Sequence, residues 1–312
     1  MKKKITIILP AYNEQACFPL LEQCMAQVLR DNPAYDWEFL LVNDGSTDDT
    51  LEHMISLHHA DPAHWSYIDL SRNYGKEIAM MAGFDYAKGD AVIIMDADMQ
   101  HPVSVIPEML TWWEQGYDDV YAQRRTSRES WFKRHTSRWY YSVLQRVSRV
   151  PVQKNTGDFR LLDRTCIEAL KVMRESERNT KGLYSWIGFR KKGIFYDQLA
   201  RTQGTTKWKF SQLVNLAING LTSYTVAPLR LAMYLGLGVS FVAFVYMVYI
   251  LISTLVYGDP VAGYPTIMVT ILFLGGIQLL TLGIMGEYLG RVFNETKNRP
   301  GYFVRRYNDE KV

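Results

Sequence analysis

Short apolar runs alternate with amphipathic stretches through the first 125 residues of this 312-residue chain. The runs are rich in β-branched residues and end at turn-forming residues, a pattern typical of buried strands. They predict strands at residues 5–9, 39–42, 65–70, 91–95 and 119–122. The stretches between them predict helices at residues 15–30, 47–58, 76–87 and 103–115. Such alternation indicates an α/β domain in which helices cover both faces of a mainly parallel sheet.

The hydrophobic pattern changes in the last third of the chain. Residues 231–256 and 265–285 carry no charge, and each run reaches the roughly 20 residues that cross a bilayer. The connector at 257–264 has no Lys or Arg, whereas basic residues flank the outer ends of the pair: Arg230, Arg291, Lys297, Arg299, Arg305 and Arg306. This distribution predicts a transmembrane hairpin with both chain ends in the cytoplasm. The alternative is a pair of helices buried in a soluble core.

Composition and the N-terminus narrow the possibilities further. A net charge of +3 gives no field that would attract nucleic acid. The three cysteines have no metal-binding spacing, which is typical of reduced thiols in a cytoplasmic domain. Residues 1–9 begin like a signal peptide, but the apolar run is too short and Pro10 ends it, so it is better explained as the first strand.

Two carboxylates, Asp96 and Asp98, follow the predicted strand at 91–95, and the amide of Gln100 comes two residues later. Ligands of open α/β sheets bind at the carboxyl ends of the strands. Hard oxygen ligands at that place suit Mg²⁺ or Mn²⁺, held together with substrate phosphates. The alternative is a solvated turn, because Asp-x-Asp is a common sequence.

Polar loops follow three further strands, at residues 10–14, 43–50 and 71–76. All of them are expected at the same edge of the sheet as the two carboxylates. No G-x-G-x-x-G motif follows the first strand and no Walker A loop is present, which argues against dinucleotide and P-loop proteins. A nucleotide held by carboxylates and a metal instead of glycine-rich backbone points to a nucleotide-sugar.

Taken together, four segments resemble glycosyltransferase family 2, with its GT-A fold. They are residues 10–14, 43–50, 96–100 and 156–161, the last reading Thr-Gly-Asp-Phe-Arg-Leu. Four more segments are similar to the polyprenyl-phosphate branch of that family, which includes bactoprenol glucosyltransferases and dolichol-phosphate mannosyltransferase-like enzymes. These are residues 70–77, 204–208, 286–291 and 299–302.

The resemblance implies four parts along the chain: a cytoplasmic GT-A (Rossmann-like) catalytic domain, an interfacial helix, two transmembrane helices and a cytoplasmic tail. Their bounds are residues 1–209, 210–228, 229–290 and 291–312. The apolar and polar faces of residues 210–228 suit a helix that lies on the membrane surface. A core helix is the alternative for this segment.

The resemblance also implies roles for individual residues on the donor side. Nucleotide-sugar binding falls to Pro10, Tyr12, Glu14, Asp44, Lys76, Asp96, Arg201 and Lys207. For Glu14 and Asp44, loop capping is the alternative. The metal would be held by Asp96, Asp98 and Gln100, where it neutralises charge on the departing UDP.

The catalytic residues implied by the resemblance are Asp158, Asp98 and Arg160, and Asp158 stands where the family carries its base. Residue chemistry leaves that role open. A phosphate nucleophile, with a second pKa of about 6, is already largely ionised at neutral pH and has no proton to lose. Asp158 then either orients the acceptor or balances the charge of Arg160.

Arginines among aromatic residues are the candidates for the acceptor phosphate: Arg124 and Arg138 first, then Arg134. Guanidinium groups match phosphate geometry, and the neighbouring membrane spans favour an anionic lipid over nucleic acid. A solvated surface is the alternative for each arginine taken singly.

These expectations combine into one reaction. An inverting transfer of a hexose, glucose first, would pass from a UDP-sugar to undecaprenyl phosphate at the cytoplasmic face of the bacterial inner membrane. GlcNAc, GalNAc, mannose or aminoarabinose are alternative sugars. The protein is expected to form a homo-oligomer, a tetramer. Its expected functional partners are a flippase and a second membrane glycosyltransferase.

Two other functions compete with this interpretation. A processive polysaccharide synthase usually carries Gln-x-x-Arg-Trp, whereas Arg138-Trp139 is preceded by His135 at the Gln position, and two spans make a poor polymer channel. A non-catalytic membrane scaffold would have no need of the carboxylates that this chain retains. Release of UDP with a lipid acceptor would eliminate the scaffold.

Overall fold

A computed structural model describes residues 2–125, 156–175, 178–197 and 263–312, with scattered positions between 229 and 256. The described residues form two compact units. One contains residues up to 197 together with 300–312, and the other contains the described residues from 229 to 299. The predicted interfacial helix at 210–228 lies outside the described residues.

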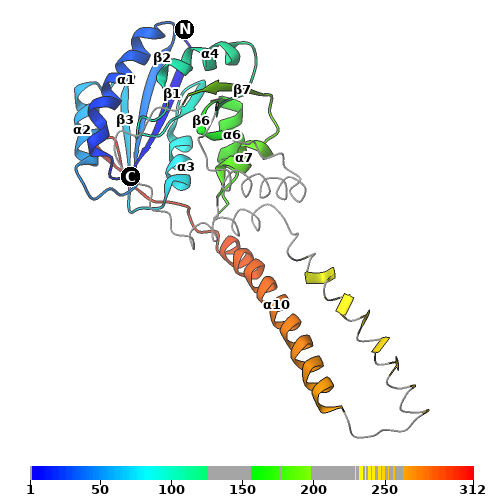
Figure 1. The fold of residues 1–312 in the computed structure, drawn as a ribbon. Coiled ribbons are helices and arrows are strands. Elements are labelled where there is room, and N and C mark those ends of the chain that lie inside the picture. The colour runs from blue at the N-terminus through cyan, green and yellow to red at the C-terminus, as the bar shows by residue number, and fades with distance from the viewer. Residues whose placement is uncertain are drawn as a thin grey trace. The chain divides into compact units, whose positions relative to one another are not determined.

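The first unit is built on one sheet with the strand order β7-β5-β6-β4-β1-β2-β3-β8-β9 (Figure 1). Its strands are β1 (Lys4–Ala11), β2 (Asp36–Asn43), β3 (Trp65–Leu70), β4 (Ala91–Ile94), β5 (Asp119–Arg124), β6 (Thr156–Asp163), β7 (Lys191–Tyr196), β8 (Val304–Tyr307) and β9 (Glu310–Lys311).

The expectation of a mainly parallel sheet is confirmed in part, because β6 and β8 run against the other strands and make the sheet mixed. Strands β4, β1, β2 and β3 form a parallel block, and β5 pairs in parallel with β7. In contrast, β6 runs antiparallel to both β4 and β5, and β8 runs antiparallel to β3 and β9. The regular alternation of strand and helix predicted a parallel arrangement, but that alternation ends at β5.

Helices cover both faces of the sheet, as the sequence pattern predicts. They are α1 (Phe18–Asp31), α2 (Thr50–Ala60), α3 (Lys76–Tyr86), α4 (Ile106–Glu114), α6 (Arg164–Val172) and α7 (Thr180–Trp186). Short 3₁₀ turns, η1 (Gln15–Cys17) and η2 (Val103–Val105), precede α1 and α4. Both of these helices begin later than predicted and have a proline in their first turn, where its missing N–H costs no helical hydrogen bond.

Two apolar cores lie on opposite sides of the sheet because successive strand residues point to opposite faces. Ile5, Ile7 and Leu9 of β1 belong to the core that contains residues of α1, α2 and α4. Ile8 belongs to the other core, which contains residues of α3, α6 and α7. The central strands are therefore buried on both faces, which explains why their sequences are continuously apolar.

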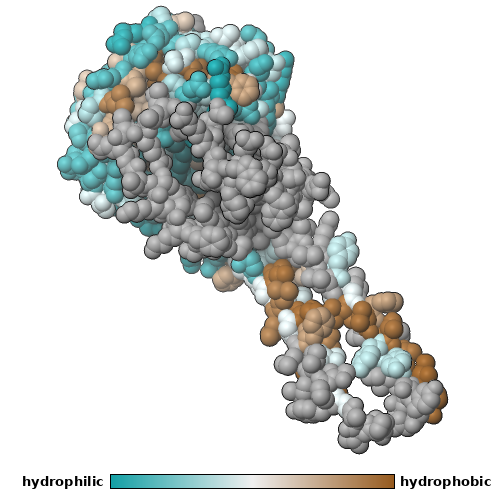
Figure 2. Space-filling model, viewed as in Figure 1, coloured by the Kyte–Doolittle hydropathy of each residue, from teal (hydrophilic) through white to brown (hydrophobic). Residues whose placement is uncertain are grey.

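The second unit contains the long helix α10 (Tyr264–Thr296). Within the described residues, one segment, Phe273–Thr296, is long and apolar enough to cross a membrane, with none of its apolar window buried. The space-filling view shows apolar residues along this unit (Figure 2). The predicted span at 265–285 lies inside α10, whereas the span predicted at 231–256 is described only at scattered positions, all of them helical.

The segment that follows α10 returns to the sheet of the first unit. Strand β8 pairs with β3, and β9 pairs with β8. The Tyr302 hydroxyl donates a 2.6 Å hydrogen bond to Asp85 Oδ2 on α3, and Gly301 packs against Met81 of the same helix. Sequence analysis did not find these strands and treated residues 291–312 as a tail.

Candidate active site

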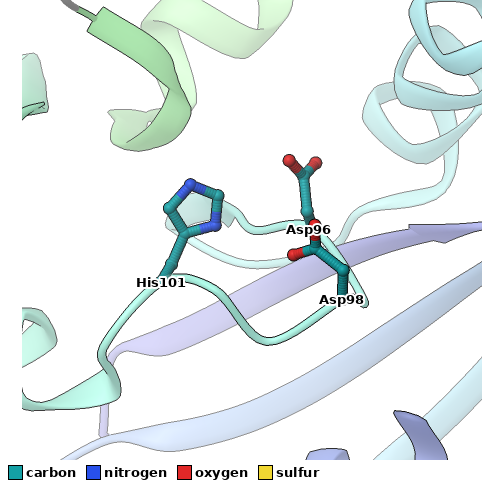
Figure 3. A group of neighbouring side chains, drawn as sticks. All are labelled: Asp96, Asp98 and His101. Atoms are coloured by element: carbon teal, nitrogen blue, oxygen red, sulfur yellow. The ribbon is translucent and has the colours of Figure 1, made fainter. Parts of the chain in front are cut away.

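Asp96, Asp98 and His101 lie on one loop that follows β4 at the carboxyl end of the parallel block (Figure 3). One ligand atom from each residue lies within 4.8 Å of the others. The close-up shows both carboxylates next to each other with the imidazole beside them. The three side chains form a group of the size that one metal ion needs.

Gln100, predicted as a metal ligand, contacts Asp98. Its side-chain Nε2 donates to Asp98 Oδ2 at 2.6 Å, and its backbone N–H donates to Asp98 Oδ1 at 3.1 Å. Both oxygens of Asp98 are oriented by these contacts. His101, one residue further on, is the candidate ligand that sequence reasoning missed, because that reasoning looked only for oxygen ligands.

The imidazole of His101 is buried and packs against Phe159 of β6, with ring centroids 4.8 Å apart. Burial lowers its pKa, and this effect outweighs the opposing influence of Asp96 and Asp98. The ring is therefore neutral at pH 7 and has a lone pair to offer. Its Nδ1 atom makes no hydrogen bond within the described part of the chain. A neutral imidazole next to two carboxylates fits a divalent cation.

Lys76 connects the metal candidate Asp96 to Asp158. As the first residue of α3, it places its Nζ 2.5 Å from Asp96 Oδ1 and 2.8 Å from Asp158 Oδ2. Asp158 reaches this point because β6 runs antiparallel to β4 and begins beyond the carboxyl end of that strand. Three segments that are distant in the sequence thus meet at one ion-pair network.

The charges of this network fix the ionisation of its members. Burial acts to raise the pKa of Asp158, but Lys76 and Lys181 outweigh it, so the pKa lies below its usual value. Burial likewise acts to lower the pKa of Lys76, but Asp96 and Asp158 raise it. Lys76 and Asp158 are both charged at neutral pH.

Arg160 makes its ion pair with Asp119 of β5, not with Asp158. Its Nη1 lies 3.0 Å from Asp119 Oδ2, and both side chains are buried. The guanidinium also lies over the ring of Tyr184, 3.7 Å from the centroid. Of the two roles that the sequence left open for Asp158, balancing the charge of Arg160 is replaced by an ion pair with Lys76.

The loops after β1 and β2 are joined by hydrogen bonds. Asn13 Oδ1 accepts from the backbone of Thr47 at 2.8 Å, and the backbone N–H of Asn13 donates to Ser46 Oγ at 3.1 Å. Two of the predicted donor-binding residues flank Asn13 in the chain: Tyr12, which is exposed, and Glu14, which is half-buried. Pro10 precedes them in β1.

Glu14 lies close enough to Asp96 and Asp98 for their charges to act on it. Burial raises its pKa, and the charges of Asp98 and Asp96 raise it further. Cys17 donates to Glu14 Oε2 at 3.2 Å. Glu14, Asp96 and Asp98 thus bring three carboxylates together, and among the described residues Lys76 forms an ion pair with Asp96. This excess of negative charge favours binding of a cation.

Asp44, expected at the base or the ribose, uses both carboxylate oxygens on the loop before α3. It accepts from the backbone of Tyr74 at 2.7 Å and of Gly75 at 2.9 Å. Gly45 follows in the left-handed region, with φ of +67°, and a Cβ there would lie 2.4 Å from the carbonyl carbon of Arg72. The loops after β2 and β3 are thereby packed backbone to backbone.

Among the acceptor candidates, Arg124 is described. It ends β5, and its Nε donates to the Tyr196 hydroxyl at 3.4 Å. Its charge lowers the pKa of His101, so it lies within electrostatic reach of the carboxylate group. The other basic residues predicted for the phosphates lie outside the described residues: Arg134, Arg138, Arg201 and Lys207.

A mixed α/β sheet whose parallel block ends at such a cluster is the architecture of a nucleotide-sugar transferase domain. Two family models match the chain, Glycosyl transferase family 2 over residues 6–171 and the GtrB C-terminal hairpin over residues 227–292. The chain belongs to glycosyl transferase family 2. It is a glycosyltransferase, and its C-terminal hairpin associates it with the membrane.

Several relatives are similar over nearly the full length. The SfII prophage-derived bactoprenol glucosyl transferase of Shigella flexneri is 39% identical, covering 97% of this chain and 98% of the relative. The prophage bactoprenol glucosyl transferase homolog of Escherichia coli (strain K12) is also 39% identical, with coverage of 97% and 99%. The CsbB protein of Bacillus subtilis (strain 168) is 42% identical, with coverage of 97% and 92%.

Similarity to solved structures is more distant. Glucosyl-3-phosphoglycerate synthase from Mycobacterium tuberculosis, solved with Mn²⁺, UDP and phosphoglyceric acid, is 16% identical with a TM-score of 0.48. The match covers 70% of this chain and 76% of that one. This degree of likeness carries no argument about the site.

Proposed function

We propose that this protein transfers glucose from UDP-glucose to a polyprenyl phosphate, undecaprenyl phosphate in bacteria, with inversion at the anomeric carbon. The observation that carries the proposal is the similarity to bactoprenol glucosyl transferases over 97% of the chain. That similarity spans both the sheet with its carboxylate group and the hairpin. The reaction would take place at the cytoplasmic face, where the UDP-sugar is available.

Asp96, Asp98 and His101 would hold Mg²⁺ or Mn²⁺, with Gln100 orienting Asp98. When bound, the metal would neutralise negative charge on the diphosphate of the departing UDP. The imidazole favours Mn²⁺, because Mg²⁺ takes oxygen ligands almost exclusively. The neutral state of His101 supports this ligand set.

Lys76 is proposed to serve the donor phosphates. Its ammonium group stands between Asp96 and Asp158, and a divalent cation on Asp96 would take over half of its present ion pairing. The ammonium group of Lys76 would then pair with a diphosphate oxygen of the donor while it keeps its contact with Asp158. Because Lys76 would contact both the donor and Asp158, donor binding would influence the position of Asp158.

Asp158 is proposed to position charge and not to remove a proton. An acceptor phosphate is already largely ionised at neutral pH, with a pKa of about 6. Its oxygen would attack the anomeric carbon, and the bond to UDP would break with the electron pair leaving on the β-phosphate. The lowered pKa of Asp158 agrees with a group that stays ionised.

Positive charge at the acceptor side would come from Arg124 at the end of β5, together with Arg134 and Arg138. Arg201 and Lys207 would add charge for the diphosphate. The membrane hairpin keeps the site near a lipid-borne acceptor, which raises its effective concentration. The proposal includes assembly of the protein as a tetramer. It also includes a flippase that moves the lipid-linked sugar across the membrane and a second transferase that uses it.

The test is an incubation of membranes containing the protein with undecaprenyl phosphate, Mn²⁺ or Mg²⁺ and a panel of radiolabelled UDP-sugars. Label from UDP-glucose in the lipid phase, lost in Asp98→Asn, would support the proposal. Label from another UDP-sugar would correct the identity of the sugar. Long labelled polymers would indicate a synthase, and UDP binding without transfer to any lipid would indicate the scaffold.

A further inference from the structure

Arg305 is the extra residue of a β-bulge at the edge of the sheet. Where β8 pairs with β3, Asp69 lies opposite Arg306 and Leu70 lies opposite Val304, so that Arg305 has no partner of its own. A bulge of this kind redirects the side chain of the extra residue. The guanidinium of Arg305 lies 3.6 Å from Asp69 Oδ2, and it donates to the Ser71 carbonyl at 2.9 Å.

Asp69 is a buried carboxylate, 1% exposed, and it needs compensation for its charge. Its Oδ1 accepts a 2.8 Å hydrogen bond from Asn43 Nδ2, while Oδ2 accepts none within the described residues. Among those residues, Arg305 is the ion-pair partner of Asp69. The bulge therefore brings a cation to a carboxylate that the sheet has removed from water.

The charge on Asp69 fixes which way the amide of Asn43 points. A carboxylate only accepts hydrogen bonds, so the Asn43 side chain must turn its nitrogen toward Asp69 and its oxygen away. That oxygen accepts from the backbone N–H of Ser46 at 3.0 Å and closes the first turn of the loop at residues 43–50. Ser46 and Thr47 are the residues that bond Asn13 in the neighbouring loop.

A second contact joins the segment that contains Arg305 to the loop before α3. The carbonyl of Phe303 accepts from the backbone N–H of Ser71 at 2.9 Å, at the start of the loop before α3. That loop donates two backbone hydrogen bonds to Asp44. Residues 303–305 thus contact Asp69, which bonds Asn43, and the loop before α3, which bonds Asp44.

We propose that Arg305 is a positioning residue for the donor: through Asp69 and Asn43 it holds the loop at residues 43–50 in its binding conformation. The assignment of that loop to the nucleotide rests on the proposed function. The geometric link between Arg305 and the loop does not depend on it. A residue that follows the membrane hairpin in the chain would then determine how well the site holds UDP.

The experiment uses the full-length protein in detergent, with Arg305→Met, Arg305→Lys and the matched control Arg306→Met, the neighbouring exposed arginine of β8. Hydrogen exchange of the backbone amides at residues 44–48 is measured first, and UDP affinity with Mn²⁺ second. Arg305→Met should accelerate exchange at these amides and weaken UDP binding, each by up to about tenfold, because it loses both the ion pair to Asp69 and the charge-assisted hydrogen bond to the Ser71 carbonyl.

Arg305→Lys should recover part of both effects, and Arg306→Met should match the wild type. Unchanged exchange at residues 44–48 in Arg305→Met would overturn the proposal. If wild-type protein binds no UDP, the proposed function fails, but the exchange data still decide whether Arg305 holds the loop. Should Arg305→Met not fold, Asp69→Asn replaces it, because a neutral amide lets Asn43 turn over and should give the same local increase in exchange.

Discussion

Lys76 and Asp158 form a 2.8 Å ion pair between the first turn of α3 and the start of β6. The carboxylate is buried, whereas the lysine side chain is 42% exposed, so solvent weakens the interaction. The pair explains why two ionisable groups remain charged in a partly buried site. It also gives the site a testable electrostatic signature.

Replacing Lys76 with Met should lower stability at neutral pH by about 1–2 kcal/mol, after allowance for the exposure of the lysine. The pKa of Asp158 is lowered in the fold, so its stabilisation is present above the unfolded value of about 3.9 and is lost as the pH falls through the folded pKa. The raised pKa of Lys76 has the opposite sense: its stabilisation is present below about pH 10.4 and is lost as the pH rises through the folded pKa.

Thermal unfolding at a series of pH values measures this difference. The difference in unfolding free energy between wild type and Lys76→Met should have its full value from about pH 5 to pH 10 and should decrease below about pH 4. Lys192→Met, whose ammonium lies over the ring of Trp112 away from the carboxylates, is the control. A gap that persists unchanged at pH 3 would contradict an ion pair with Asp158.

Asp158→Asn should reduce the transfer rate by at least about tenfold without moving the pH optimum. The lowered pKa keeps Asp158 ionised throughout the neutral range, so its protonation cannot produce the acid limb of the rate profile there. Initial rates from pH 5.5 to pH 8.5 with saturating donor provide the measurement. An acid limb present in the wild type and absent from Asp158→Asn would establish Asp158 as a base after all.

Metal affinity should rank the residues of the loop after β4. Mn²⁺ binding, followed by electron paramagnetic resonance, should weaken most in Asp98→Asn and strongly in His101→Ala. Gln100→Ala should cost about tenfold or more, as is typical of a residue that orients a ligand. Asp31→Asn, which alters an exposed carboxylate at the end of α1, is the control. Greater weakening in Gln100→Ala than in His101→Ala would favour Gln100 over His101 as the third ligand.

The buried pair of Arg160 and Asp119 should behave as a structural unit. Arg160→Met removes the nearer of the two cations beside the buried Asp119 carboxylate and leaves Lys191 at 3.8 Å, which should cost about 3 kcal/mol. The double variant Arg160→Met, Asp119→Leu should regain most of this loss in a thermal unfolding measurement. A double variant that is stable but inactive would instead assign Arg160 a role in the reaction, as the sequence resemblance implies.

Gly45→Ala should be far more damaging than Gly116→Ala, although both glycines have positive φ. A Cβ at Gly45 would lie 2.4 Å from the backbone of Arg72, whereas at Gly116 the nearest atom is 3.9 Å away. Gly116→Ala therefore carries only the conformational cost of about 1 kcal/mol, and Gly45→Ala must also separate two loops. UDP affinity should fall in Gly45→Ala alone; equal losses in both would rule out the close loop contact.

The sequence predicts the parallel block well because periodicity and β-branched residues are local signals. The strand at 65–70 has the predicted bounds, and the two loop carboxylates lie at the end of the strand that was expected to carry them. The direction of β6 has no such local signal, because a strand pairs with whatever edge the fold presents. Without that direction, the contact between Asp158 and Lys76 could not be predicted.

Strand β8 was missed for a related reason. Its sequence, Val-Arg-Arg-Tyr, has two consecutive arginines and no alternation of apolar and polar residues. The bulge accounts for this, since one of the arginines turns toward Asp69 and breaks the two-residue period. The residues that look most like a solvated tail are thus the ones that fold onto the sheet.

The position of β8 in the chain has a consequence for biosynthesis. Domains usually fold from the N-terminus as the chain emerges from the ribosome. Here β3 receives its second neighbour, β8, and Asp69 receives its cation only after the whole hairpin has been translated. The support that Arg305 is proposed to give the loop at residues 43–50 would therefore form late, after both helices of the hairpin have been synthesised.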